Sequence, residues 1–218
     1  MGERDMLTPN DIVKLAIKQM REWKHEDRRN EIHLTDLVSP CIRKIWFEKK
    51  DPLPDDIESV YRLWWGKCAH EMPLTSHSEL KLEYEGVKTS IDEYHDVEKV
   101  VIEKKTIEFM PKDMNELQKY YSHYIQQLQL ETLFLINNGY DVRQSFLLFF
   151  KFGDGEKGRL PIQAFEIPFN YEDAIKLFIE RKNILTEALR NKEPPDIPDN
   201  FSPFDYPCSY CKYRSRCF

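Results

Sequence analysis

The chain has 218 residues, of which 41% are hydrophobic and 32% charged, and its formal net charge is −6. These values allow one domain with a sizeable core and exclude a mainly disordered chain. No apolar run approaches the roughly 20 residues of a membrane span, and the polar segment 1–10 is unlike a signal peptide, so we expect a cytoplasmic protein with no membrane partner. The acidic total argues weakly against a nucleic-acid binder but leaves room for a local basic patch.

The first third of the chain has the spacing of apolar residues that is typical of helices. A period close to 3.6 residues predicts a helix over 9–28, capped by Thr8 or Asn10. Two further helices are predicted over 43–50 and 57–71. These three helices contain no strand signal of comparable strength.

The middle of the chain changes to alternating polar and apolar residues. This pattern predicts a meander of three strands over 80–84, 87–94 and 97–109, with a turn at Glu85-Gly86. The remaining predicted elements are a helix over 114–138, two strands over 143–152 and 162–168 around a loop at 153–158, and a helix over 171–191. The order predicts an α/β fold in which helices cover a mixed sheet.

Two neighbouring predicted strands carry residues suited to metal-dependent phosphodiester hydrolysis, which needs hard oxygen ligands, an activated water and a cation near the phosphate. Side chains alternate along a strand, so Glu103 and Lys105 point to one face. Lys104 points to the other face and offers the metal its backbone carbonyl. If the strands pair, Asp92 lies within a few ångströms of Glu103. Such charges are also common on a solvated strand, and a lone His70 is more often structural than a ligand.

Five cysteines form a second candidate site. An odd count in a reducing compartment does not indicate a disulfide framework. Cys208, Cys211 and Cys217 crowd the last eleven residues as C-x2-C-x5-C, which is typical of metal or cluster ligands. We favour Cys41 as the fourth thiolate because a proline interrupts any helix entering it. Cys68, on a predicted helix, is the alternative and is otherwise a small buried side chain.

The chemistry of the tail leaves two questions open. Four thiolates suit zinc as well as an iron–sulfur cluster. The tail also combines aromatic and basic side chains that either stack on single-stranded nucleic acid or pack around the cluster. These side chains are Tyr206, Tyr210, Tyr213 and Phe218, with Lys212, Arg214 and Arg216 beside them.

Several motifs occur in one order along nearly the whole chain. They are Leu34-Thr-Asp-Leu, Cys41-Ile-Arg-Lys, Gly66-Lys-Cys-Ala-His-Glu, Gly86-Val-Lys-Thr-Ser-Ile-Asp, Val101-Ile-Glu-Lys-Lys, His123-Tyr-Ile-Gln-Gln-Leu-Gln-Leu and the tail from Cys208 to Cys217. In this set the chain resembles the CRISPR-associated exonucleases related to RecB, members of the PD-(D/E)xK superfamily that carry an iron–sulfur cluster. Each motif is weak by itself, and the combination is specific.

The resemblance implies a single domain over 1–218 with the restriction-endonuclease-like mixed sheet flanked by helices. The nuclease core would span 57–194, and segments 1–56 and 195–218 would together form a helical iron–sulfur elaboration. A [4Fe–4S] cluster would be held by Cys41, Cys208, Cys211 and Cys217.

The resemblance also implies roles for the candidate catalytic residues. His70, Asp92, Glu103 and the Lys104 carbonyl would hold Mn²⁺ or Mg²⁺. Lys105 would orient or activate the water and steady the phosphate, and Gln127 would position DNA or Lys105. The family usually has a tyrosine four residues after that glutamine, and this chain has Glu131 there. The departure leaves the role of the helix open.

The implied activity is a metal-dependent DNA exonuclease acting on single strands or overhangs. Its implied task is to trim new spacer DNA during CRISPR adaptation, beside the spacer integrase. Two alternatives remain: a RecB-like nuclease of DNA repair or replication, which includes virus-encoded relatives, and a non-catalytic nucleic-acid-binding iron–sulfur protein.

Overall fold

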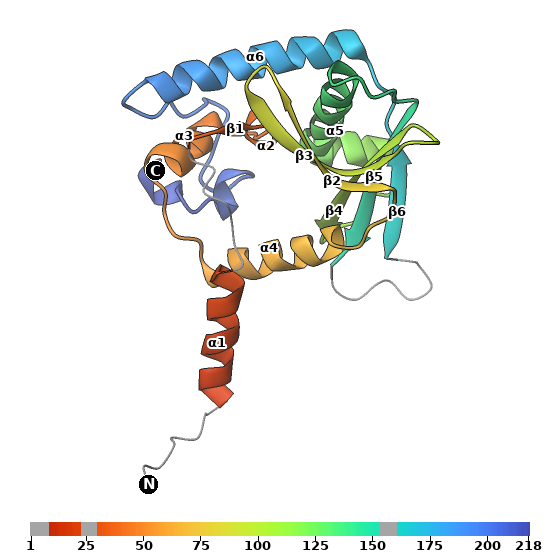
Figure 1. Cartoon of the computed structure of the whole chain (residues 1–218). Helices are drawn as coiled ribbons and strands as arrows, with labels where there is room; N and C mark the ends of the chain where they lie inside the picture. The colour runs from red at the N-terminus through yellow and green to blue at the C-terminus, as the bar shows by residue number, and fades with distance from the viewer. Residues whose placement is uncertain (1–8, 23–29, 153–160) are drawn as a thin grey trace.

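The computed structural model describes residues 9–22, 30–152 and 161–218, and most strands of its mixed sheet lie on one side of the molecule, away from the helix α3 Ile42–Lys50 (Figure 1). The strands are β1 Ile32–His33, β2 His77–Tyr84, β3 Val87–His95, β4 Val100–Ile107, β5 Gln144–Lys151 and β6 Ile162–Glu166. Their hydrogen-bonded order is β1-β3-β4-β5-β6, and β2 pairs with β3 outside this path. The pairs β1–β3 and β4–β5 are parallel and the others are antiparallel, so the predicted mixed α/β fold is confirmed.

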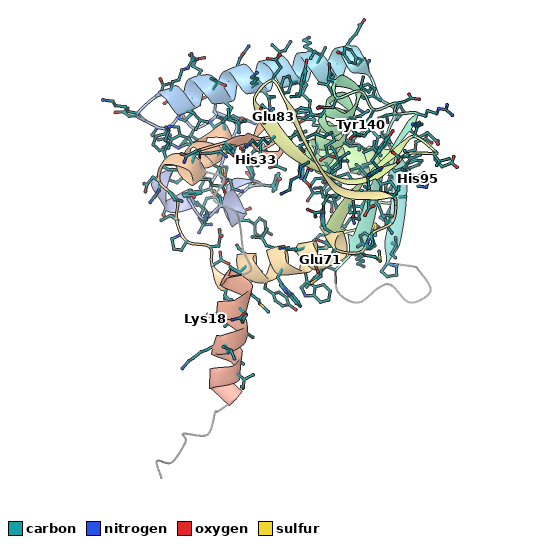
Figure 2. The ribbon with its side chains drawn as sticks, in the orientation of Figure 1. Lys18, His33, Glu71, Glu83, His95 and Tyr140 are labelled. Atoms are coloured by element: carbon teal, nitrogen blue, oxygen red, sulfur yellow. The ribbon has the colours of Figure 1, made fainter. Side chains whose placement is uncertain are left out.

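Helices flank the sheet. They are α1 Pro9–Glu22, α2 Leu34–Leu37, α3 Ile42–Lys50, α4 Ile57–His70, α5 Met114–Asn137 and α6 Tyr171–Arg190, followed by the 3-10 turns η1 Cys208–Tyr210 and η2 Arg214–Arg216. α5 packs between α6 and the sheet, and α1 projects away from the other elements (Figure 1). Figure 2 shows Lys18 on this projecting helix and Glu71, the residue after α4, beside the sheet. Within the described ranges, none of the helices is long and apolar enough to cross a bilayer.

The hairpin between β2 and β3 confirms the predicted turn at Glu85 and Gly86. Tyr84 pairs with Val87, so the loop has two residues. Their φ angles are 53° and 76°, the positive values of a type I′ turn, which follows the twist of an antiparallel pair. Glycine adopts this conformation without a steric penalty.

The apolar core surrounds α5. One cluster joins α5 to α2, α3 and α6 through residues such as Leu133, Leu37 and Phe178. A second joins α5 to the sheet through residues such as Leu128 and Val101. Because partners cover α5 on both sides, even its polar residues Gln127, Glu131 and Thr132 are buried.

The other predicted elements are also found, with boundaries that differ by a few residues. β1 and α2 were not predicted from the sequence. Both lie in the sheet and core beside α5, so part of the predicted elaboration 1–56 packs continuously with the predicted core 57–194. The predicted helix beyond residue 22, its Thr8 cap and the loop 153–158 lie outside the described residues.

A fully buried ion pair supports the sheet behind the candidate site. The Lys104 ammonium donates to Glu93 Oε1 at 2.7 Å and to the carbonyls of His70 and Met72 at 2.8 and 2.9 Å. Glu93 Oε2 accepts from the Thr75 backbone N–H at 3.0 Å and its hydroxyl at 2.8 Å. Every oxygen of this buried carboxylate is therefore paired.

We expect Lys104→Met to lower the free energy of unfolding by about 3–5 kcal/mol, because it leaves Glu93 charged, buried and unpaired. The double variant Glu93→Gln, Lys104→Met should recover much of that loss, since no charge is then buried. Urea unfolding of both variants measures the difference. A cost below about 1 kcal/mol for the single variant would show that water reaches the pair.

Candidate active site

The candidate site lies where β3 and β4 stop pairing. The two strands share three residue pairs, of which Glu93 with Ile102 is the last before they separate. β4 then continues along β5, and the first residues of β3 pair with β1. At this fork the Lys104 backbone N–H donates to Asp92 Oδ2 at 2.8 Å. A carboxylate thus takes the place of a backbone acceptor where the ladder ends.

Strand alternation sorts the charged residues at the fork as predicted. Asp92 and Glu103 lie on one face, near enough for each to influence the pKa of the other. Glu93 and Lys104 lie on the other face and pair with each other. The Lys105 ammonium donates to Glu103 Oε1, and it also lies 5.0 Å from the centre of the Tyr124 ring.

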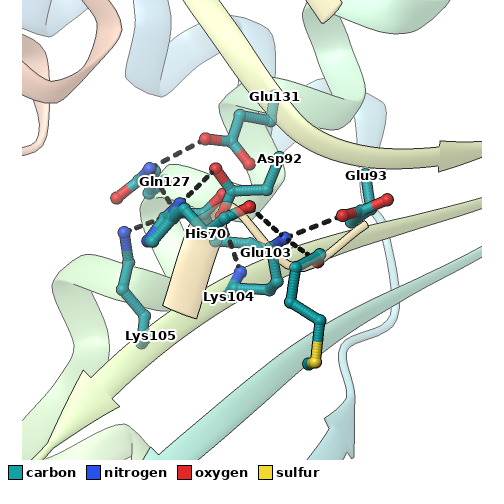
Figure 3. Close-up of polar contacts among 9 residues, drawn as sticks. His70, Asp92, Glu93, Glu103, Lys104, Lys105, Gln127 and Glu131 are labelled. Carbon is teal, nitrogen blue, oxygen red and sulfur yellow. Dashed lines mark hydrogen bonds and ion pairs between the residues drawn. The ribbon is translucent and has the colours of Figure 1, made fainter. Parts of the chain in front are cut away.

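His70 joins the site from the carboxyl end of α4. Its Nδ1 lies 2.8 Å from Asp92 Oδ1 (Figure 3). Its backbone carbonyl is held by Lys104 from the other side of the sheet. The histidine and its carboxylate partner are therefore positioned by the same stretch of β4.

The helix α5 supplies Gln127 and Glu131, one turn apart on the same face (Figure 3). Gln127 Nε2 donates to Glu103 Oε1 at 2.6 Å and to Glu131 Oε1 at 2.8 Å. The predicted role of Gln127 in positioning Lys105 is indirect here, because both side chains bind the same Glu103 oxygen. The sequence signal for Glu131 was its spacing of four residues from Gln127.

The protonation of these groups follows from burial and mutual charge. Burial raises the pKa of Glu103 to about 7, since it outweighs the nearby Lys105, and the charge of Asp92 adds to the rise. Burial and the charges of Glu103 and Asp92 raise the pKa of Glu131 well above its usual range. Burial opposes ionisation of Asp92 and His70, but their hydrogen bond lowers the pKa of Asp92 and raises that of His70.

All six residues predicted for this site come together: His70, Asp92, Glu103, Lys104, Lys105 and Gln127. Among the residues that the structure describes, however, no three His, Cys, Asp or Glu side chains converge as ligands of a single ion. At the fork, the acidic side chains are engaged by other groups and do not converge on one point. Asp92 is hydrogen-bonded to His70 and Lys104, and Glu103 Oε1 is hydrogen-bonded to Lys105 and Gln127. The second oxygens of Glu103 and Glu131 are buried without a partner.

The four cysteines predicted as ligands line one pocket. Cys41 begins α3 and its sulfur accepts from the Lys44 backbone N–H at 3.4 Å, and Cys217 accepts from Arg43 Nε at 3.4 Å. Burial and the charges of neighbouring cysteines raise the pKa of Cys41 and Cys208. Such crowding disfavours free thiolates and suits a positively charged metal centre. Cys68, the alternative ligand, does not line this pocket and is half-buried on α4.

The aromatic and basic residues of the tail differ in their burial and contacts. Tyr213 is buried and stacks on Phe47, with ring centres 5.1 Å apart. Lys212 pairs with Asp55 at 2.7 Å. Tyr210, in contrast, is 84% exposed. Part of the tail therefore packs around the cysteine pocket, and part faces outward.

The raised pKa of Glu103 predicts how stability changes with pH in the absence of metal. Between about pH 4.5 and 7 the folded protein retains a proton on Glu103 that the unfolded chain has released, so the contribution of Glu103 to the free energy of unfolding falls across this range. Urea unfolding in EDTA at several pH values measures the fall. Glu103→Gln, which cannot titrate, should make the profile flatter, and an unchanged slope would refute this assignment.

The comparisons with known proteins concern the fold. The sequence matches no model of a protein family, and it matches none of the curated proteins searched. The crystal structure of SSO0001 is similar over 94% of this chain and 96% of that chain, with 19% identity and a TM-score of 0.54. The crystal structure of a phage related exonuclease from Haemophilus somnus 129PT covers 77% of this chain and 95% of its own, with 13% identity and a TM-score of 0.46, a likeness too loose to support a conclusion. The chain therefore shares its overall fold with SSO0001 along nearly the full length of both.

Proposed function

We propose that this protein is a divalent-metal-dependent DNA nuclease whose active site is the fork between β3 and β4. The observation that carries the proposal is the convergence of Asp92, Glu103 and Lys105 with His70 at one point of the sheet. Two acids, a lysine and a histidine are the residue types that metal-assisted phosphodiester hydrolysis uses.

The donor set fits Mn²⁺ or Mg²⁺. These ions prefer oxygen ligands, and Glu103 keeps one buried carboxylate oxygen without a partner. His70, Asp92, Glu103 and the Lys104 carbonyl would hold the ion, which when bound acidifies a water and neutralises phosphate charge. The hydrogen bond between His70 and Asp92, and that between Lys105 and Glu103, keep these side chains oriented until then.

Lys105 is the group placed to act on the phosphate. Its ammonium stays charged, because the carboxylates of Glu103, Asp92 and Glu131 outweigh the effect of burial and raise its pKa. Once released from Glu103, it can donate to a non-bridging phosphate oxygen and offset the charge that develops in the transition state. Gln127 holds the Glu103 carboxylate while this exchange takes place.

The substrate and biological setting are proposed from the sequence resemblance. We propose an exonuclease that acts on single-stranded DNA or overhangs and trims new spacer DNA in CRISPR adaptation, in contact with the spacer integrase. We also propose that Cys41, Cys208, Cys211 and Cys217 hold a [4Fe–4S] cluster. The shared pocket and the basic Arg43 beside Cys217 support this assignment.

Cleavage of end-labelled single-stranded DNA with Mn²⁺ tests the nuclease. Wild type should degrade the strand, and Glu103→Ala and Lys105→Ala should each reduce the rate at least about 100-fold, because each removes a group that acts on the transition state. Glu108→Ala and Lys112→Ala, which alter exposed residues beyond β4, are the matched controls and should retain the rate. A folded wild type that cleaves no DNA in Mn²⁺ or Mg²⁺ contradicts the proposal.

Protein purified without oxygen tests the cluster. It should be brown, with broad absorption near ~400 nm that arises from thiolate-bound iron. Cys41→Ala should lose this absorption and lower the midpoint of thermal unfolding, whereas Cys68→Ala, outside the pocket, should keep both. Colourless protein with one equivalent of zinc would overturn the assignment.

A further inference from the structure

Three buried glutamates near the fork differ in how their oxygens are used. Glu93, Glu103 and Glu131 are 0%, 1% and 0% exposed. Both oxygens of Glu93 are paired, with Lys104 on one side and Thr75 on the other. Glu103 and Glu131 each keep Oε2 without a hydrogen-bond partner among the described residues. Glu93 therefore shows how this fold satisfies a structural carboxylate, and the other two depart from that pattern.

The two unpaired oxygens belong to neighbouring groups. Gln127 Nε2 lies 2.6 Å from Glu103 Oε1 and 2.8 Å from Glu131 Oε1, so these oxygens are at most about 5.4 Å apart. One amide nitrogen uses both of its hydrogens to hold the two carboxylates toward each other. A buried carboxylate oxygen without a donor is costly, so this arrangement is most stable when a cation completes it.

The chemistry of the position favours a hard divalent ion. Mg²⁺ and Mn²⁺ are commonly held by one or two carboxylates, with waters and substrate phosphates completing the shell. Nearby cations are already engaged elsewhere: Lys104 pairs with Glu93 and Lys105 with Glu103 Oε1. Two neighbouring buried carboxylates thus provide the negative charge that such an ion requires.

We propose that Glu103 and Glu131 bind a second divalent cation through their unpaired oxygens, beside the ion held by His70, Asp92 and Glu103. Glu103 bridges the two positions, as carboxylates do in sites where two ions lie about 3.5–4 Å apart. The inference rests on the proposed nuclease, and it adds Glu131 to the ligands. In the competing explanation, Glu131 only orients Gln127.

Mn²⁺ binding to the metal-stripped full chain with its cysteine centre intact tests the inference. Titration calorimetry should find two equivalents in wild type and one in Glu131→Gln, which keeps the shape and the hydrogen bonds but removes the charge. Electron paramagnetic resonance should show a spin-coupled pair of ions in wild type and an isolated ion in the variant. The affinity of the remaining ion should fall by no more than about 10–100-fold, the range for a residue outside its immediate ligands.

Matched variants cover the possibility that Glu131→Gln fails to fold. Glu131→Asp and Glu131→Asn have the same size, so a second ion bound by the first variant and lost by the second isolates the effect of charge. Equal stoichiometry in wild type and Glu131→Gln, or two equivalents bound by Glu131→Asn, overturns the inference while a metal-dependent nuclease stands. Absence of both Mn²⁺ binding and DNA cleavage in wild type overturns the proposed function itself.

Discussion

The short pairing between β3 and β4 is the constraint on which the candidate site depends. After three residue pairs β3 and β4 part, and β4 remains paired only with β5, which it follows along its whole length. The backbone N–H of Lys104 would then lack an acceptor, and Asp92 supplies one. One residue therefore both caps the open end of the ladder and presents its other oxygen to His70. The break in the sheet creates the space in which charged groups can meet.

The two faces of β4 at this fork show contrasting uses of buried charge. On one face, Lys104 and Glu93 neutralise each other and are surrounded by further donors and acceptors, which is the arrangement that makes a buried ion pair tolerable. On the other face, acidic groups outnumber the single Lys105, and burial, reinforced by the charges of the neighbouring carboxylates, raises the pKa values of Glu103 and Glu131. An excess of buried acidic groups is costly for folding, and the same excess favours the binding of a cation.

The sequence was sufficient to predict whatever depends on local periodicity. Alternation along one strand placed Glu103 and Lys105 together and Lys104 opposite, and the turn at Glu85-Gly86 fixed the strand before it. The sequence was insufficient where contacts between distant parts of the chain determine whether a strand forms or a side chain is buried. β1 contains two residues, and it is a strand because it pairs with β3, more than 50 positions away. Likewise, Glu131 is buried because α6 and the sheet cover α5 from both sides, a condition that helical periodicity does not express.

The position of α4 links the two candidate sites. Among its side chains Val60 is buried, so apolar packing holds this helix weakly, and polar contacts near its ends become correspondingly important. Just before the helix, Lys212 from the cysteine-bearing tail binds Asp55 and the Leu53 carbonyl. At its other end, Lys104 binds the carbonyl of His70.

The helix α4 therefore connects the cysteine pocket to the candidate active site. The tail that carries three of the thiols fixes the beginning of α4, and the helix transmits that position along its length to His70. If the proposed metal centre gathers the thiols, its loss would release first the tail and then the start of α4. The histidine would keep its anchor on Lys104 but lose the helix geometry that aims its ring at Asp92. A metal centre in the cysteine pocket, as proposed above, would in this way help to position His70 in the candidate active site.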